Sequence, residues 1–418
     1  MSPVPSAGGF ATVNPHALST ILEASETQSI IASTDIFDLN GIKLWARNQP
    51  VSQELQRKLM DRALQKPLET CLIAEDGINP NKLAVLVQGL IDSNGPLTTL
   101  LTPHADALRR GAMSIKLHPV VQLLLSAAQT ARPSTFSHAI EGMAVAGALV
   151  KARGGDERLL TLAMTAGLLH DVGEMYIAPE FGEADAGVSL DINTYRQLVV
   201  HPHIGQLLIS QLTDYPKDIV RAVAEHHEHL DGSGYPHRLS GDQISPLGRN
   251  LAVTEAALAA LRAENATLHH ASMALRVVPG EFDEHLTGPL TIAARTIPPM
   301  TATRALPQLH EQLASLDMVL QTAMNRVDSL TSDAASEGLQ RAATLARYLL
   351  RKLRSGWNES GLWSASGFGE AQAAEAEAAQ DALRVRLHEI DRVVRLSAGT
   401  LSHEETDILD RMCEGLSE

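Results

Sequence analysis

Histidine and carboxylate residues gather in three short segments in the middle of the chain. These segments are GLLHDVGEMYIAPE around His170-Asp171, HPHIG at 201–205, and AEHHEHLDGSGYP at 224–236. The chain of 418 residues has only 17 histidines, so adjacent His-Asp and His-His pairs are a clear local enrichment. Neutral imidazole together with carboxylate suits Mn, Fe or Zn better than Ca or Mg. A carboxylate among several histidines is also what a paired-metal hydrolytic site requires, so the pattern predicts a metal centre.

Helical periodicity gives an independent reason for these side chains to meet. Residues at i, i+3, i+4 and i+7 share one face of a helix. Five ligand-type residues extend a face of small or apolar residues: His138 with Gly142, Val145 and Leu149; His170 with Leu159, Leu162, Ala163 and Ala166; His226 with Ile219, Ala222 and Val223; His227 with Val220, Val223 and Ala224; Glu255 with Leu251, Ala252 and Leu258. A carboxylate on an apolar face is costly unless it is paired or binds a metal. We therefore expect the helices to direct these residues toward one centre.

The same residues resemble, in order, the HD-GYP branch of the HD-domain phosphohydrolases, a family that hydrolyses cyclic di-GMP in bacteria. The resemblance extends from about residue 135 to 262. Its matching elements are His170-Asp171-x-Gly, His201-Pro-x-x-Gly, His226-His227-Glu228-x-x-Asp231-Gly-x-Gly234-Tyr235-Pro236 and the following RNLAVTEAALAAL. These ordered elements, which include the Gly-Tyr-Pro tripeptide, are far more specific than a lone His-Asp pair.

The resemblance implies a role for each of these positions. The implied metal ligands are His138, His170, Asp171, His201, His226, His227 and Glu255. Asp171 would bridge two divalent transition metal ions, with Fe or Mn expected and Ni, Zn or Mg left open. Such ions lower the pKa of a bridging water and polarise phosphoryl oxygens. Cyclic di-GMP would then be opened to a linear dinucleotide or on to GMP.

The resemblance also implies substrate contacts beside the metal ligands. Gly234, Tyr235 and Pro236 would lie in a loop next to the substrate, where the family also meets partner proteins. Arg249 immediately precedes the Glu255 helix and is expected to meet a phosphate, with a structural salt bridge as the alternative. His203, His229 and His237 lie close to the motifs, but we interpret them as polar surface residues.

The sequence departs from the family pattern at four places. The lysine of HDxGK is replaced by Glu174, so an expected catalytic position carries an anion. Loss of one electrostatic stabiliser typically costs ~10²–10³ in rate, unless Glu174 binds a metal or pairs with an arginine. Glu255 replaces an aspartate, and Ser134 replaces the glutamate of three-metal members, which favours two ions. The Arg-Pro-Tyr segment that usually follows is absent.

These departures leave several functions open. The first hypothesis is a cyclic di-GMP phosphodiesterase. The second is a catalytically degenerate protein that senses the nucleotide or serves as an interaction module, and the third is hydrolysis of another nucleotide or phosphate ester. The alternative to a metal centre is a set of hydrogen-bonded core histidines in an inactive HD fold.

Composition excludes several other classes of protein. A formal net charge of −15 argues against binding to a nucleic-acid backbone. The N-terminus has no basic segment followed by an apolar one, so we expect no secretory signal. No uncharged apolar run approaches the ~18 residues of a membrane span. Cys71 and Cys413 match no metal or redox spacing. We therefore expect a soluble, cytoplasmic protein.

The predicted fold is mainly α, with an all-helical HD-type domain after a small α+β module and before a helical C-terminal region. Aromatic residues are only 3% of the chain, which favours helices packed through aliphatic side chains. Asn40-Gly41 lies between alternating apolar residues and predicts a type I′ hairpin. Dimerisation through the C-terminal helices stays open. The expected segments are 1–26, a loosely ordered lead-in; 27–76, a small α+β regulatory or docking module; 77–133, a helical connector; 134–262, the metal-binding domain; 263–306, an irregular linker; and 307–418, the helical C-terminal region.

Overall fold

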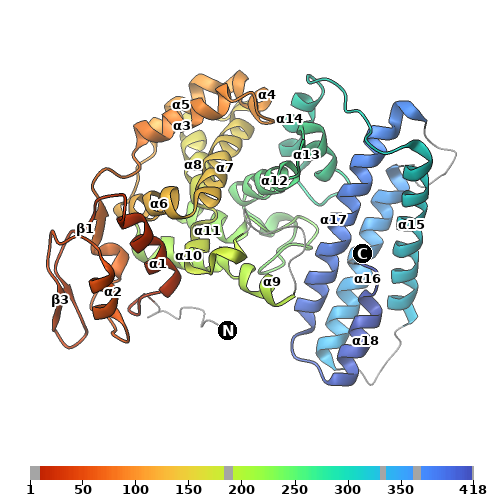
Figure 1. The fold of residues 1–418 in the computed structure, drawn as a ribbon. Coiled ribbons are helices and arrows are strands. Elements are labelled where there is room, and N and C mark those ends of the chain that lie inside the picture. Colours follow the sequence, from red (N-terminus) through yellow and green to blue (C-terminus); the bar gives the residue numbers. More distant parts are fainter. Residues whose placement is uncertain (1–9, 183–191, 330–335, 361–368, 417–418) are drawn as a thin grey trace. The chain divides into compact units, whose positions relative to one another are not determined.

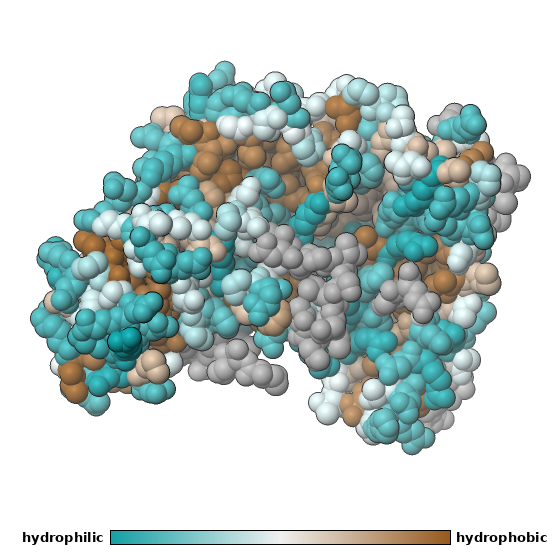
Figure 2. Space-filling model, viewed as in Figure 1, coloured by the Kyte–Doolittle hydropathy of each residue, from teal (hydrophilic) through white to brown (hydrophobic). Residues whose placement is uncertain are grey.

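The structure is a computed structural model that describes residues 10–182, 192–329, 336–360 and 369–416. Helices make up most of this part of the chain, and two small antiparallel sheets lie near its N-terminal end (Figure 1). The mainly helical fold predicted from the sequence is therefore confirmed. In the space-filling view, hydrophilic residues cover much of the visible face and apolar residues gather in separate areas on it (Figure 2). Among the described residues, no helix is both long enough and apolar enough to cross a membrane.

The described chain divides into two compact units. Unit 1 contains the residues up to Glu228 together with Tyr235–His237 and Gln243–Glu255. Unit 2 contains His229–Gly234, Arg238–Asp242 and the residues from Ala256 onward. The division of the sequence into six functional segments stays a prediction, although two of its structural details are corrected below.

Helix α1 (Pro15–Ser25) occupies much of the segment expected to be a loose lead-in, so that expectation is wrong from residue 15 onward; residues 1–9 lie outside the described residues. Asn14 explains where the helix begins, because its side chain accepts hydrogen bonds from the backbone N–H groups of His16 and Ala17 (2.9 and 3.0 Å). Pro15 suits the first helical position, where no N–H donor is needed. The inward face of α1 includes Ala17, Leu18, Ile21 and Ala24, all buried.

After α1, the α+β module consists of four short strands, the small helix α2 and the 3₁₀ helix η1. Strand β1 (Ile30–Ala32) pairs with β4 (Leu72–Ala74), and β2 (Ile36–Phe37) pairs with β3 (Lys43–Trp45), both antiparallel. Helix α2 spans Gln53–Leu59 and the 3₁₀ helix η1 spans Leu68–Thr70. Residues 10–76 are called the N-terminal module below.

The hairpin between β2 and β3 is confirmed, but its turn is not type I′. That turn needs positive φ at both central residues, whereas of Asn40 and Gly41 only Gly41 has a positive φ, of 81°. Instead, the side chain of Asp38 accepts hydrogen bonds from the N–H groups of Asn40 and Ile42 (3.0 and 2.8 Å). The carboxylate of Asp38 thus closes a wider loop than the sequence predicts.

A series of helices follows the module. Their bounds are α3 (Pro80–Asp92), α4 (Thr98–Leu101), η2 (Thr102–His104), α5 (Ala105–Ser114), α6 (Pro119–Ala131), α7 (Pro133–Ala152), α8 (Glu157–Leu169), η3 (Val172–Tyr176), η4 (Pro179–Phe181), α9 (Ile192–Leu198), α10 (His201–Leu212), α11 (Lys217–Glu225), η5 (Gly241–Gln243) and α12 (Pro246–Leu261). Helix α7 is apolar nearly all round and buried along most of its length, which is typical of a central core helix.

Helices α7 and α8 lie side by side (Figure 1) and approach each other at two glycines. A Cβ atom at Gly142 would lie 2.9 Å from the carbonyl oxygen of Gly167 and 2.8 Å from the ring of His170. A larger residue at Gly142 would therefore push the two helices apart. The contact allows His138 on α7 to reach His170 at the end of α8.

The apolar face of α8 differs slightly from its predicted phase. Leu159, expected on the inward face with His170, is 44% exposed, and Leu160 is fully buried instead. Farther along, Ala163 and Ala166 are buried as expected. The N-terminal end of α8 is thus turned by one residue relative to the predicted face, while the end that carries His170 follows it.

The remaining helices belong to unit 2. Their bounds are α13 (Leu268–Ala274), α14 (Glu284–Ala294), α15 (Leu306–Ser329), α16 (Glu337–Ser360), η6 (Glu370–Gln372), α17 (Ala373–Ala398) and α18 (His403–Cys413). Residues 263–306 are therefore not wholly irregular, because they contain α13 and α14. The prolines of this segment led to the wrong expectation, but Thr267 and Asp283 cap the two helices. The predicted helical character of residues 307–418 is confirmed for the described part.

Candidate metal centre

The structure brings together all seven residues predicted as metal ligands. They come from six helical elements or their ends: His138 from α7, His170 from the C-terminus of α8, Asp171 from the start of η3, His201 from the first turn of α10, His226 and His227 from the end of α11, and Glu255 from α12. All seven are buried, and the most exposed of them, His227, has only 8% of its surface accessible. They form two groups of four that share Asp171.

The first group contains His138, His170, Asp171 and Glu255. One potential ligand atom from each of the four lies within 4.8 Å of the others. Glu255 Oε2 is 2.7 Å from His138 Nε2 and 3.3 Å from His170 Nε2. The two Nε2 atoms are 3.2 Å apart. Asp171 Oδ2 lies 3.3 Å from His138 Nε2 and 3.2 Å from His170 Nε2.

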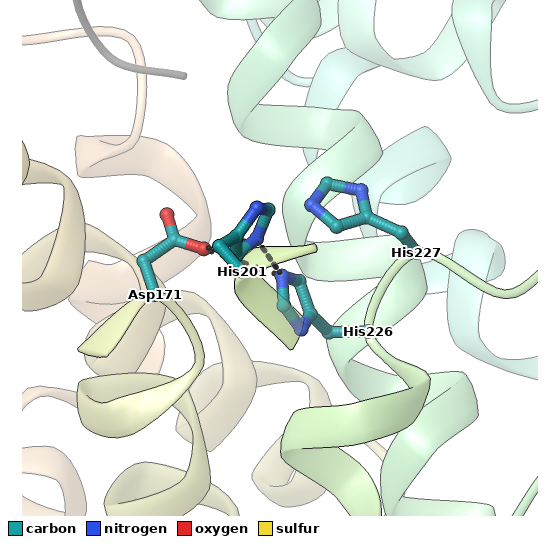
Figure 3. Close-up of side chains that lie close together, drawn as sticks. All are labelled: Asp171, His201, His226 and His227. Carbon is teal, nitrogen blue, oxygen red and sulfur yellow. Dashed lines mark hydrogen bonds and ion pairs between the residues drawn. The ribbon is translucent and has the colours of Figure 1, made fainter. Parts of the chain in front are cut away.

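The second group contains Asp171, His201, His226 and His227 (Figure 3). Asp171 Oδ1 lies 3.3 Å from His201 Nε2 and 3.2 Å from His226 Nε2, and these two nitrogens are 3.0 Å apart. The ring of His227 lies beside them, with its centroid 4.1 Å from that of His226 and 5.1 Å from that of His201. Asp171 thus directs one carboxylate oxygen to each group, as a bridging ligand would.

Backbone carbonyl groups orient three of the histidine rings. His170 Nδ1 lies 2.7 Å from the oxygen of Gly167, His201 Nδ1 lies 2.7 Å from that of Leu198, and His226 Nδ1 lies 2.6 Å from that of Val223. Since a carbonyl oxygen only accepts, each Nδ1–H donates, and whenever the ring is neutral its Nε2 presents a lone pair to the centre. Hydrogen bonds of this kind commonly orient metal-bound histidines.

The chemistry of the donor set fits a metal centre. With Nδ1 as the donor, the Nε2 atoms of His201 and His226 are two acceptors only 3.0 Å apart. Two lone pairs at this distance repel each other unless a cation or a proton lies between them. Imidazole nitrogens and carboxylate oxygens together suit a transition metal. The two groups can therefore each hold a divalent ion.

Charge distribution differs between the two groups when no ion is bound. Burial lowers the pKa of His138, but the carboxylates of Glu255 and Asp171 outweigh it and raise this pKa to about 10. Burial would lower the pKa of His170, but the carboxylates of Asp171 and Glu255 outweigh burial and raise this pKa well above its ordinary value. In the second group, burial and the neighbouring His227 lower the pKa of His226 to about 3. Metal binding must therefore displace protons from the first group, whereas His226 is already neutral.

Glu174 belongs to neither group of four among the described residues. It lies in η3, fully buried, and its carboxylate is next to Gly182: a Cβ atom placed on Gly182 would be 3.1 Å from Glu174 Oε2. Its backbone oxygen accepts a hydrogen bond from Arg132 Nη1 (2.8 Å). The structure therefore places an arginine beside this residue, in contact with its main chain.

The predicted substrate loop contacts the second group through Tyr235. The ring of Tyr235 stacks on that of His227, with centroids 4.5 Å apart and planes inclined by 15°. Its backbone N–H donates to the oxygen of His227 (3.0 Å). Gly234 is buried and Pro236 is half-buried. Arg249 is half-buried as well, and its Nε donates to the oxygen of Ile244 (3.1 Å).

His229 is not the surface residue that the sequence suggests. Its Nδ1 lies 3.1 Å from Glu281 Oε1, and the other oxygen of that carboxylate lies 3.0 Å from Arg386 Nη2. Glu281 and Arg386 are largely buried, and all three belong to unit 2. Neither partner lies in a recognisable motif, so nothing in the sequence connects His229 with residues 52 and 157 positions away.

Glu225 is a buried carboxylate beside the histidine pair whose structural role sequence reasoning missed. It directly precedes His226, is buried, and accepts hydrogen bonds from Ser245 N (2.9 Å), Ser245 Oγ (2.5 Å) and Arg221 Nε (2.6 Å). These contacts hold the end of α11 against the start of α12. The available signal was a second carboxylate directly beside the histidine pair, on a helix whose inward face is apolar.

Comparisons with known proteins agree with this geometry. A family model described as an HD domain matches residues 122–280. The cyclic di-GMP phosphodiesterase PA4108 of Pseudomonas aeruginosa is 30% identical over 156 residues, which is 37% of this chain and 37% of that protein. The 3'3'-cGAMP-specific phosphodiesterase 3 of Vibrio cholerae is 33% identical over 84 residues, which is 20% of this chain and 18% of that protein. The match therefore covers well under half the length of either relative.

A solved structure, the HDG"Y"P protein Bd1817 from Bdellovibrio bacteriovorus, aligns with 65% of this chain and 97% of its own, at 12% identity and a TM-score of 0.37. This likeness is too distant to support an argument. The family match, residues 122–280, contains all seven clustered residues. Residues 122–280 of the chain thus match the HD-domain family model, and part of the chain is similar to two cyclic-dinucleotide phosphodiesterases.

Proposed function

We propose that this protein is a metal-dependent phosphodiesterase that hydrolyses a cyclic dinucleotide, with cyclic di-GMP as the first candidate and a linear dinucleotide or GMP as the product. The observation that carries the proposal is the position of Asp171, which directs Oδ2 to one group of ligands and Oδ1 to another. The names of the two relatives support a cyclic dinucleotide as the substrate class.

The proposed ligands divide between two ions that share Asp171. His138, His170 and Glu255 would hold one ion, and His201, His226 and His227 would hold the other. Fe or Mn fits this set of nitrogen and oxygen donors best, and Ni, Zn and Mg are the alternatives. Bound ions at such a site supply a water of lowered pKa and stabilise charge on phosphoryl oxygens. The role of the protein is to fix the spacing of the two ions and exclude bulk water.

Aromatic rings beside the second group offer a surface on which a base of the substrate can stack. Tyr235 stacks on His227 and contacts Tyr195 edge to face, with ring centroids 5.9 Å apart. Aromatic rings of this kind offer stacking surfaces to nucleobases, at about 1–3 kcal/mol per base. We propose that Gly234, Tyr235 and Pro236 border the substrate and that Arg249 meets a phosphate. A protein partner at this loop and a homodimer remain predictions.

A second candidate function is binding of the nucleotide without turnover. The observation that favours it is Glu174, a buried anion three residues after Asp171, where the family has a lysine. Near a phosphate, this carboxylate would repel the substrate or be driven to take up a proton. Such a protein would act as a sensor of the cyclic dinucleotide or as an interaction module.

The test measures binding and hydrolysis on one sample of the full chain loaded with Mn²⁺ or Fe²⁺. Cyclic di-GMP and 3'3'-cGAMP are each supplied, products are separated by chromatography, and binding is measured by calorimetry. The enzyme predicts turnover that is lost in Asp171→Ala. Binding without turnover would support the sensor, and the absence of both would contradict the two candidates together.

A further inference from the structure

The short helix η3, which follows Asp171, is packed directly against the helix that supplies His201. A Cβ atom at Gly173 would lie only 2.0 Å from the carbonyl oxygen of His201 and 2.7 Å from the backbone nitrogen of Gly205. The main chain of η3 thus touches the first turn of α10. Within η3, the N–H of Glu174 donates to the oxygen of Asp171 (2.9 Å). Any displacement of η3 therefore changes the position of Asp171 relative to His201.

Arg132 holds the opposite side of η3. It is buried and lies between α6 and α7, directly before the helix that carries His138. Its Nη1 donates to the oxygen of Glu174 (2.8 Å) and its Nη2 to the oxygen of Ile177 (3.1 Å). Its Nε donates to Thr20 Oγ1 on α1 (3.0 Å). One guanidinium thus connects η3, the start of α7 and the N-terminal module.

Tyr176, the last residue of η3, makes a second connection to the N-terminal module. Its hydroxyl donates to Glu69 Oε1 in η1 (2.6 Å), and both side chains are buried. Burial raises the pKa of Tyr176 well above its ordinary value, and Glu69 adds to this rise, so the phenol keeps its proton. Asn14 Nδ2 donates to the oxygen of Tyr176 (3.1 Å), and the ring of Phe10 meets that of Tyr176 edge to face, with centroids 5.6 Å apart.

These contacts place charged and polar groups in the interior of the fold, where burial carries a free-energy cost. A buried guanidinium or carboxyl group is unfavourable unless its hydrogen-bonding partners are in place. Here the donors of Arg132 and Tyr176 satisfy acceptors from separate parts of the chain, and two of these acceptors are main-chain oxygens of η3 and the residue after it. The network therefore fixes the backbone of η3, not only its side chains.

We propose that the N-terminal module is a built-in support of the metal centre, and that Arg132 and Tyr176 are positioning residues that set the place of Asp171 through η3. A change in the module is then transmitted to the bridging carboxylate. The inference rests on the proposed metal site, but it holds whether the substrate is cyclic di-GMP, another nucleotide or only a bound ligand.

The test is titration of the full, metal-free chain with Co²⁺, followed by visible absorption, which reports both the affinity and the coordination of the ion. Tyr176→Phe removes one hydroxyl at nearly constant shape, and Arg132→Met removes the three donors. We expect Co²⁺ affinity to fall on the order of 3–30-fold in both variants, the range typical of residues that act through others. We also expect an altered absorption spectrum.

Conservative and control variants separate positioning from stability. Glu69→Gln keeps an oxygen acceptor for Tyr176 and should retain most of the affinity. Arg62→Met removes the ion pair with Asp38 (2.9 Å) on the hairpin of the same module and should leave Co²⁺ binding unchanged. Thr20→Val removes the acceptor of Arg132 Nε, together with the hydrogen bond that Thr20 Oγ1 donates to the oxygen of His16 (3.0 Å), and should have a smaller effect than Arg132→Met.

Two results would overturn the inference. Variants that unfold at lower temperature yet bind Co²⁺ with wild-type affinity and spectrum would show a structural role alone. A wild-type chain that binds no Co²⁺ would remove the metal centre itself. Failure of the proposed function looks different, because it would appear as absent hydrolysis in a chain that still binds Co²⁺ and still responds to Tyr176→Phe.

Discussion

Asp171, the proposed bridging carboxylate, is the residue on which the proposed metal site depends. Asp171 is buried, and burial alone would raise its pKa; the surrounding histidines outweigh burial and hold the pKa well below its ordinary value. The carboxylate is therefore an anion, able to attract a cation to each of its oxygens. The raised pKa values of His138 and His170 favour their protonated forms when no ion is bound, so an ion at the first group would displace protons.

Exchange of one charge tests the importance of Glu174. We expect Glu174→Lys to raise the rate of cyclic di-GMP hydrolysis, or the affinity for the nucleotide, by on the order of 10²-fold if the side chain faces the phosphate, because one electrostatic stabiliser is worth about that much. Initial rates and calorimetric affinities measure the change. Glu174→Gln is the matched control, which removes the anion without adding a cation and should give a smaller gain. Unchanged rates in both variants would place this side chain away from the substrate.

The thiol of Cys413 gives a pH-dependent prediction. Burial and then the nearby Asp391 raise its pKa from 9.0 to about 12. Between these two pH values the unfolded chain loses a proton that the native chain keeps, so the native state becomes less stable as pH rises through this window. Urea unfolding at several pH values should show this decline. Cys413→Ala should reduce its slope; an unchanged slope would contradict the assignment.

At the scale of elements, close backbone contacts set the geometry of the site. The crossing of α7 and α8 at Gly142 and Gly167 brings His138 to His170, and the contact of η3 with α10 brings Asp171 to His201. Both contacts depend on glycine, because an added Cβ would overlap the opposite main chain. The α7–α8 contact therefore sets the distance between His138 and His170, and the η3–α10 contact sets the distance between Asp171 and His201.

Gly173→Ala should separate η3 from α10 and lower metal binding. The added methyl would meet the oxygen of His201 at 2.0 Å, so the backbone must shift. We expect the variant to retain less than half the wild-type metal, measured by elemental analysis after gel filtration. Gly89→Ala is the control, because a Cβ at that position in α3 has no atom within 4 Å and alanine is favoured over glycine in a helix by about 0.5–1 kcal/mol. Equal metal content in the two variants would contradict this role of η3.

Helical phase predicted that five of the seven clustered side chains face inward, whereas Asp171 and His201 were assigned from the motifs and the resemblance. Glu255 shares its face with Leu251, Ala252 and Leu258, and all four are buried, as the pattern indicates. Phase is less reliable where a helix ends at the edge of the core, and Leu159 shows this limit. The separation of the ligands into two groups was implied by resemblance and could not be obtained from phase, because it depends on how the helices cross.

Across the whole molecule, contacts between distant segments were beyond sequence reasoning. Arg132 is 112 residues from Thr20 and 42 from Glu174, and no periodicity connects these positions. His229 was misplaced for the same reason, since Glu281 and Arg386 lie in unit 2 and outside any motif. The α13 and α14 helices were missed because prolines in their segment obscured the capping signals of Thr267 and Asp283.

The proposed centre has two metal positions joined by the carboxylate of Asp171. The most direct measurement is the number of Mn or Fe ions per chain, determined by elemental analysis of the wild type, His138→Ala and Asp171→Asn after equilibration with each metal. A bridged pair predicts about two ions in the wild type, about one in His138→Ala, and a loss from both positions in Asp171→Asn. The same metal content in all three proteins would contradict the account.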